Sequence, residues 1–201
     1  MTIVDEIVVK HLGRVEYAPT ARAMREFTLA RGEATVDELW LVEHPPTYTL
    51  GQGAASVTVG NAIPVVQSDR GGEVTYHGPG QVVLYTLIDL ARRGIKVKEF
   101  VRLLEQAVID LVGLGAQRRS GAPGVYVDGA KVAALGIRVT RGRAYHGVSL
   151  NVDMDLSPFS AIDPCGYPGL AVTQTRDLGI SGTPGELGER LVDHVTRLLS
   201  A

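Results

Sequence analysis

The chain of 201 residues has one cysteine, no large excess of charge and no long apolar run. A lone Cys165 excludes an internal disulfide, and a free thiol is typical of proteins in a reducing compartment. The formal net charge of −2 gives no electrostatic reason to expect nucleic acid. No segment has the apolar length of a membrane span, and no secretory signal is visible at the N-terminus. We therefore expect a cytoplasmic protein that binds neither nucleic acid nor membranes.

Internal repeats, low-complexity tracts and linker-like stretches are also absent. Their absence excludes a repeat array, and the length of the chain suits one sizeable hydrophobic core. Hydrophobic residues make up 45% of the sequence and charged residues 21%, as is usual for a globular protein. We expect residues 1–201 to form a single domain.

Hydrophobic spacing predicts the main helices and strands. Apolar residues at helical spacing predict helices over Pro19–Ala30 and Val97–Val112, and a last helix over 187–198. Asp128-Gly129 is a strong hairpin signal between two apolar runs. Strands are expected at 39–42, 125–127, 131–133 and 148–152. Hairpin-joined strands with long helices between them indicate an α+β fold, with a mixed or largely antiparallel sheet and helices packed on it.

A glycine-rich segment, Arg70–Gln81, separates the apolar runs 63–66 and 82–88, which predicts a loop between two strands. Glycine permits positive φ angles and a close approach of backbone to a ligand. An ordinary Gly/Pro turn would explain the glycines. It would not explain the interleaved Arg70, Tyr76 and His77, so we favour a binding loop.

Five blocks spread over most of the chain carry a family resemblance. They are HPPTYTLG at 44–51, RGGEVTYHGPGQ at 70–81, KVAALGI at 131–137, HGVSLN at 146–151 and IDPCG at 162–166. In these residues and in their order, the chain resembles the lipoate-protein ligase B family, the octanoyltransferases of lipoate biosynthesis. The resemblance implies the biotin/lipoate protein ligase fold, and it makes the single domain a catalytic one.

The resemblance also implies an activity and its partners. An octanoyl group would pass from octanoyl-acyl carrier protein to a lysine of a lipoyl domain. The acceptors would be the lipoyl domains of 2-oxoacid dehydrogenase complexes and the glycine cleavage carrier protein. The sequence contains no HExxH motif and no Cys/His cluster, so no metal is expected, and the implied reaction needs no cofactor.

Cys165 and Lys131 are the catalytic pair that the resemblance implies. Taken alone, a single cysteine is more often a small buried apolar residue, and Lys131 could be a solvated hairpin lysine. As a pair they are chemically coherent, because a nearby ammonium stabilises the thiolate, the form of cysteine that attacks. In the family, the cysteine carries the acyl group as a thioester.

Further residues are implied to bind the substrate. Small and apolar side chains suit a saturated acyl chain, whose burial is worth roughly 0.8 kcal/mol per methylene. His77 and His146 could orient other groups, act as a supplementary base, or be hydrogen-bonded core histidines. The implied substrate-binding residues are Arg70, Gly71, Gly72, Glu73, Val74, Thr75, Tyr76, His77, Ala134, Leu135, Gly136, Gly147, Val148 and Ser149.

Three other functions remain open at this point. An ATP-dependent lipoate or biotin ligase of the same fold would also combine a glycine-rich loop with a lysine. Such lipoate ligases tend to have an aspartate where this chain has Gly78, and they do not rely on a cysteine in a Pro-Cys-Gly sequence. A non-catalytic module that binds acyl groups or lipoyl domains is the second alternative, and a cysteine hydrolase is a weaker third.

Overall fold

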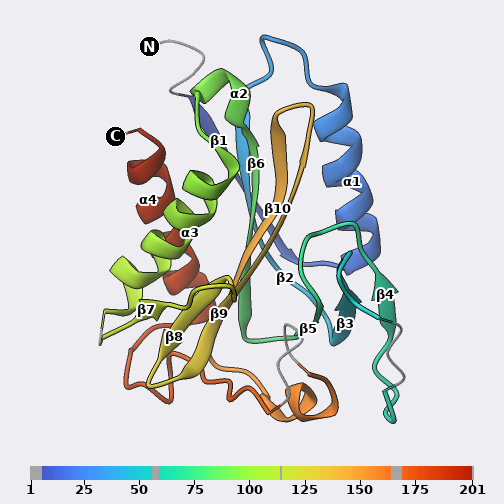
Figure 1. Ribbon diagram of the computed structural model, residues 1–201, viewed down its shortest axis with the longest axis vertical. Coiled ribbons are helices and arrows are strands. Elements are labelled where there is room, and N and C mark those ends of the chain that lie inside the picture. The colour runs from blue at the N-terminus through green and yellow to red at the C-terminus, as the bar shows by residue number, and fades with distance from the viewer. Residues whose placement is uncertain (1–5, 56–58, 114, 164–168, 201) are drawn as a thin grey trace.

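A central sheet with helices on both sides dominates the computed structural model, which describes residues 6–55, 59–113, 115–163 and 169–200 (Figure 1). Helices α3 (Val97–Val112) and α4 (Pro184–Leu199) lie together on one side. Helix α1 (Tyr17–Ala30) lies on the other side, next to a second and smaller sheet. None of the helices in the described part of the chain is both long and apolar enough to cross a membrane.

The large sheet has seven strands in the order β1-β2-β6-β10-β9-β8-β7. Only β1 and β2 pair in parallel, and every other neighbouring pair is antiparallel, so the sheet is mixed. The short helix α2 (Leu90–Arg93) follows β6 directly. The strands are β1 (Ile7–Arg14), β2 (Asp37–Glu43), β6 (Gln81–Asp89), β7 (Gln117–Arg118), β8 (Gly124–Val127), β9 (Ala130–Thr140) and β10 (Arg143–Asn151).

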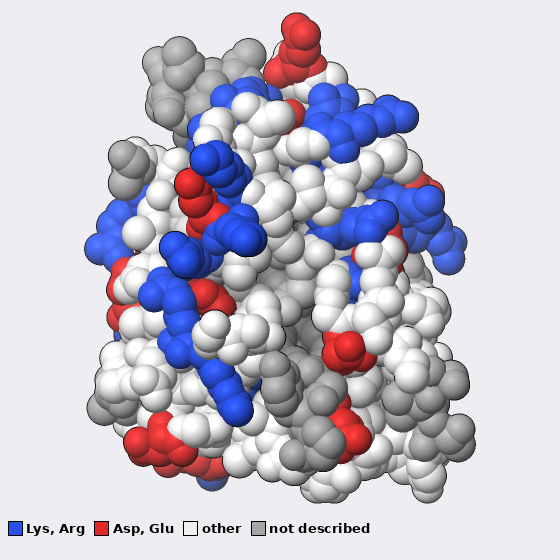
Figure 2. Space-filling view, in the orientation of Figure 1, with Lys and Arg blue, Asp and Glu red and all other residues white. Residues whose placement is uncertain are grey.

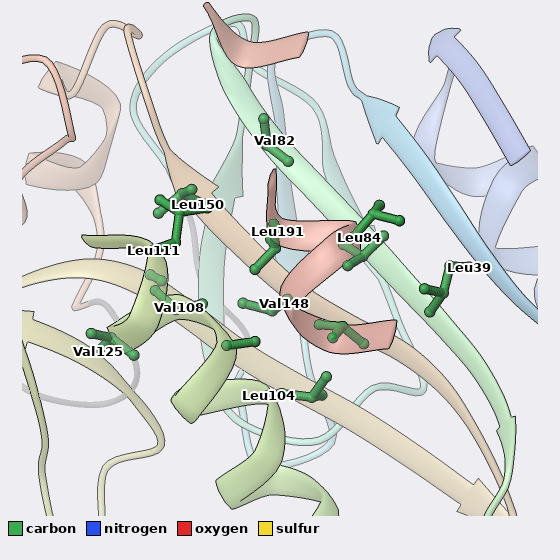
Figure 3. Close-up of a cluster of buried hydrophobic side chains, with 14 of the residues drawn as sticks. Leu39, Val82, Leu84, Leu104, Val108, Leu111, Val125, Val148, Leu150 and Leu191 are labelled. Carbon is green, nitrogen blue, oxygen red and sulfur yellow. The ribbon is translucent and has the colours of Figure 1, made fainter. Parts of the chain in front are cut away.

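The main hydrophobic core lies between this sheet and helices α3 and α4. Figure 3 shows Leu104 and Val108 of α3 and Leu191 of α4 close to side chains of β6 and β10. Each of these side chains is fully buried, which contributes about 1.5–3 kcal/mol apiece to folding. The helices therefore cover one face of the sheet and leave the other face to α1 and the smaller sheet.

The smaller sheet has three strands, β4 (Val65–Gln67), β3 (Thr47–Leu50) and β5 (Val74–His77), in that order. Its strands pack a separate apolar cluster against the 3-10 helix η1 (Ser157–Ala161). In that cluster the ring of Tyr76 meets the ring of Phe159 edge-on, with centroids 5.5 Å apart.

Most of the expected elements are confirmed. Helix α3 has the predicted bounds and ends at Gly113, and the predicted hairpin turn forms at Asp128 and Gly129, which have φ angles of 49° and 82°. The sequence did not predict β1, β3 or β7, and the strands expected at 131–133 and 148–152 cover only parts of β9 and β10. The expectation of a loop over the whole of Arg70–Gln81 is wrong, because β5 forms inside it, where Val74, Thr75 and Tyr76 favour extended backbone.

Candidate active site

A pocket lies between the two sheets, lined by β5 of the small sheet and by β6, β9 and β10 of the large one. Of the fourteen residues expected to bind substrate, all but Gly71 and Tyr76 line it. Three segments that are far apart in the sequence, 70–77, 134–136 and 147–149, therefore meet around one space. The side chain of Tyr76 packs into the apolar cluster beneath the small sheet instead.

Four further residues line the pocket, namely Tyr17, Val83, Tyr85 and His146. The sequence had raised only His146, as a residue of undecided role. Tyr17 comes from α1 and Tyr85 from β6, and no local pattern in either element distinguishes a pocket residue from a core residue. Their part in the site depends on how α1 packs against the sheet.

Two glycines let the walls of the pocket approach each other. A Cβ on Gly147 would lie 2.1 Å from the carbonyl oxygen of Leu84, and one on Gly136 would lie 2.8 Å from that of Gly71. Both distances are shorter than real Cβ contacts. Any larger residue would therefore push the strands or the 70–72 loop apart.

Arg70 fixes the glycine-rich segment to the small sheet. Its buried guanidinium donates from Nη2 to the carbonyl oxygen of Thr49 at 2.6 Å and from Nε to the Thr49 hydroxyl at 3.1 Å. It also donates to the carbonyl oxygen of Gly71. The bonds to Thr49 and Gly71 make the guanidinium part of the pocket wall.

Lys131 is 3% exposed, so it is not the solvated hairpin residue that the sequence allowed. Its ammonium donates to the carbonyl oxygen of Pro123 at 3.2 Å and lies 5.2 Å from the centre of the Tyr126 ring. Its backbone N–H donates to Ala171 and its carbonyl accepts from Thr173. Burial of an ammonium is costly unless it is hydrogen-bonded, so the Pro123 carbonyl and the Tyr126 ring offset part of the cost of burying Lys131.

Cys165, expected to be the nucleophile, lies outside the described residues. The chain on either side of it is placed, however. Asp163 lines a cavity that it shares with Glu73 and Val74, two residues of the main pocket. On the far side, Ala171 is bonded to Lys131. Both flanks of the cysteine segment thus lie beside groups of the site.

Two buried histidines near the pocket are held neutral. His44 donates from Nδ1 to the carbonyl oxygen of Val15, so its Nε2 accepts from the hydroxyl of Tyr85, each at 2.6 Å. His77 donates from Nδ1 to Gln81 Oε1 at 2.7 Å, because the amide nitrogen of Gln81 is used elsewhere. Burial lowers the pKa of both rings, that of His77 to about 3.

His146 forms a pair with Asp69. Its Nε2 lies 2.8 Å from Asp69 Oδ1, and the hydroxyl of Tyr145 donates to the other carboxylate oxygen. The bond from His146 is the main reason that the pKa of Asp69 falls to about 2, and burial lowers the pKa of His146. The ring therefore donates from Nε2, and its buried Nδ1 has no partner among the described residues. No pattern in the sequence pointed to Asp69.

In the described part of the chain, no three His, Cys, Asp or Glu side chains are grouped so that they could hold a metal ion.

Comparison with known proteins shows which family and which relatives this chain is similar to. The model of the lipoyl protein ligase A/B catalytic domain matches residues 17–196. The octanoyltransferase of Dechloromonas aromatica (strain RCB) is 59% identical over 197 residues, which cover 96% of either chain. That of Azoarcus sp. (strain BH72) is 57% identical and covers 96% of this chain and 88% of the relative.

Solved structures share the fold at much lower identity. The bi-partite lipoate protein ligase structure from Thermoplasma acidophilum is 15% identical, with a TM-score of 0.72 over 96% of this chain and 84% of that one. The fold expected from the resemblance, that of the biotin and lipoate protein ligases, is confirmed.

Proposed function

The chain belongs to the lipoyl protein ligase A/B catalytic domain family, and on this premise we propose that it is an octanoyltransferase of protein lipoylation. It takes an octanoyl group from octanoyl-acyl carrier protein and transfers it to a lysine of a lipoyl domain. The observation that carries the proposal is the pocket, because the segments expected to bind the acyl chain meet around it. The reaction belongs in the cytoplasm, where the thiol stays reduced.

The position of Lys131 supports its role as the acid–base group. Its side chain lies over Gly124, since a Cβ there would be 2.9 Å from its Cε. Gly124 pairs with Ala134, a residue of the pocket wall. We therefore assign the reacting carbonyl of a bound acyl chain to the end of the pocket nearest this lysine.

In the first half-reaction, the thiolate of Cys165 attacks the carbonyl carbon of the octanoyl thioester. The new bond joins that carbon to the cysteine sulfur, and the bond to the phosphopantetheine sulfur breaks. Lys131 gives a proton to the departing thiolate. A covalent intermediate of this kind divides one transfer between two protein partners into two simpler steps.

In the second half-reaction, the amine of the acceptor lysine attacks the octanoyl-cysteine carbonyl. A carbon–nitrogen bond forms, the bond to the cysteine sulfur breaks, and Lys131 takes up the proton released by the amine. Enzyme and thiolate are then restored, and no metal, nucleotide or redox partner takes part in either step. A positioned acid–base group typically contributes 10²–10⁴-fold to such a rate, as an order of magnitude.

The charges on one face suit an anionic donor. Figure 2 shows Lys and Arg side chains gathered in two bands, one over α3 and one on the α1 side, with a hollow between them. Lys98 and Arg102 are exposed on α3, and Arg22 and Arg25 on α1. The phosphodiester of a phosphopantetheine arm carries negative charge, and such bands favour its approach.

Intact mass spectrometry tests the proposal. Wild-type protein is incubated with octanoyl-acyl carrier protein without ATP, and then with a lipoyl domain. We expect one octanoyl increment on the enzyme, absent in Cys165→Ala, and its passage to the lipoyl domain. Transfer that requires ATP and octanoic acid would support the ligase alternative. Binding without any covalent increment would support a non-catalytic module.

A further inference from the structure

His146 has an unusual backbone for a residue inside a strand. Its φ angle is +61°, and the other two non-glycine residues with positive φ in the described chain, Asp128 and Arg141, lie at hairpin turns. A side chain rarely adopts this conformation, because Cβ comes close to the backbone. The strain therefore needs a compensating effect at this position.

The left-handed residue changes the face on which its side chain lies. Regular alternation would place His146 on the same face as Ala144 and Val148, which pack in the core beneath α3 and α4. Instead the rings of Tyr145 and His146 stack, with centroids 5.0 Å apart, and both bind Asp69. The backbone thus brings the imidazole out of the core and into the pocket wall.

The ring is also clamped in place. Asp69 binds its Nε2, the Tyr85 ring packs edge-on against it, and its own carbonyl accepts a bond from Thr86 Oγ1 at 3.0 Å. It is 1% exposed. Such a ring cannot swing aside to admit a longer ligand without breaking these contacts.

Strand register gives the order of these groups along the strands, with His146 at the end away from Lys131. Lys131 lies over Gly124, which pairs with Ala134, whereas His146 pairs with Ile137. Three residues of extended strand span about 10 Å along the strand direction, and Gly124 and His146 are also two strand spacings apart because they lie on opposite sides of β9. An extended eight-carbon chain, built from bonds of roughly 1.5 Å in a zigzag, is about 9 Å long.

From its position next to the acyl-lining residues 147–149, at the end away from Lys131, and from the clamp on its ring, we propose that His146 forms the inner end of the acyl pocket and sets the longest chain that the enzyme accepts. The inference rests on the proposed octanoyl transfer and names the residue that selects its substrate. A longer chain would have to displace the clamped ring or leave methylenes outside the pocket. Each methylene left outside forfeits about a fourfold gain in binding.

His146→Gly tests this with little risk to folding, because glycine tolerates positive φ and relieves the strain. Arg141→Gly is the matched control, since it relieves the same kind of strain at an exposed turn outside the pocket. The measurement is kcat/KM with octanoyl-, decanoyl- and dodecanoyl-acyl carrier protein. We expect the dodecanoyl to octanoyl ratio to rise at least tenfold in His146→Gly and to stay unchanged in Arg141→Gly.

An unchanged ratio in folded His146→Gly overturns the inference, as does an equal loss for all chain lengths, which a merely structural residue would give. His146→Asn, whose shorter side chain also tolerates positive φ, should give an intermediate ratio and serves if the glycine variant does not fold. If the wild type transfers no acyl group of any length, the proposed function fails instead, which is a different result.

Discussion

The side chain of Lys131 lies across Gly124, so close that a Cβ on the glycine would be 2.9 Å from the lysine Cε and 3.2 Å from its Nζ. Gly124 is also fixed to helix α3, because its N–H donates to Glu105 Oε1 at 3.1 Å. A buried helix carboxylate thus fixes the surface on which the ammonium lies. The position of the lysine depends on the absence of one methyl group.

Gly124→Ala should therefore displace Lys131 and lower kcat for octanoyl transfer by at least about tenfold, because a displaced acid–base group loses part of a contribution of about 10²–10⁴-fold. The new methyl group would also come 2.7 Å from the Ala133 carbonyl oxygen. Gly129→Ala is the control, because it strains a positive-φ glycine that has open space around it. Equal activity in the two folded variants would show that the lysine does not depend on the glycine.

Replacing the lysine itself should affect both half-reactions. Lys131→Ala is expected to slow octanoyl transfer by about 10²–10⁴-fold and to slow iodoacetamide alkylation of Cys165 at neutral pH. Lys131→Arg keeps a positive charge but cannot exchange its proton, so it should acylate slowly and accumulate as octanoyl-enzyme. Single-turnover mass spectrometry follows each step, and near-normal transfer in the alanine variant would exclude a catalytic role.

The buried histidines should make stability fall in mild acid. The pKa of His77 is about 3 in the folded protein against 6.5 for a free ring, mainly through burial, so the unfolded chain binds more protons between these values. The contribution of His77 to the free energy of unfolding is complete above pH 6.5 and is lost as the pH falls towards 3. The free energy of unfolding should fall by about 2 kcal/mol between pH 7 and pH 5 from this group. His44 and His146 act in the same direction.

Urea unfolding at pH 7, 6 and 5 measures this slope. His77→Asn keeps a donor for Gln81 but cannot titrate, so its stability should change less with pH than that of the wild type. Identical slopes would mean that the ring is not buried as a neutral base. Asp69 affects stability in a separate pH range. Because its pKa is about 2 in the folded protein, its contribution to stability is lost only below pH 4.

Asp37 should be among the most sensitive positions for folding. Its fully buried carboxylate pairs with three arginines, Arg31, Arg92 and Arg93. Asp37→Ala would leave these charges without their common partner, at a cost of about 3–5 kcal/mol. Thermal or urea unfolding measures the loss, and Asp110→Ala, which removes an exposed pair with Arg197, should change stability by about 1 kcal/mol or less.

Charge reversal on α3 separates docking from chemistry. The double variant Lys98→Glu and Arg102→Glu should lower kcat/KM for octanoyl-acyl carrier protein about tenfold or more at low salt, with a smaller effect at high salt. Transfer from a small octanoyl thioester should not change, because neither residue lines the pocket. A similar loss with both donors would mean that the changes disturb the pocket.

Local chemistry explains which parts of the fold the sequence predicted. The spacing of apolar residues in α3 and the Asp128-Gly129 turn act over a few residues, and both were predicted correctly. Strand β3 follows two prolines and is stabilised by pairing with β4 and β5, which are distant along the chain. No local pattern could predict it.

The residues of the candidate site are likewise of two kinds, those that the sequence indicated and those that only the fold brings together. The resemblance grouped the segments that line the pocket, yet Asp69, Tyr17 and Tyr85 join it only through tertiary packing. The positive φ of His146 is equally invisible in the sequence, because it depends on a clamp from residues in other elements. Cys165 remains an expectation from the sequence.

The hydrogen bonds of Lys131 to Ala171 and Thr173 hold these two residues, which follow the cysteine segment, in register with the lysine. Asp163, which precedes the cysteine, lines the neighbouring cavity. Surface connections usually tolerate inserted or deleted residues. Between Asp163 and Ala171, however, one residue more or fewer would change how far the proposed nucleophile can reach, so we expect transfer to depend on the number of residues there.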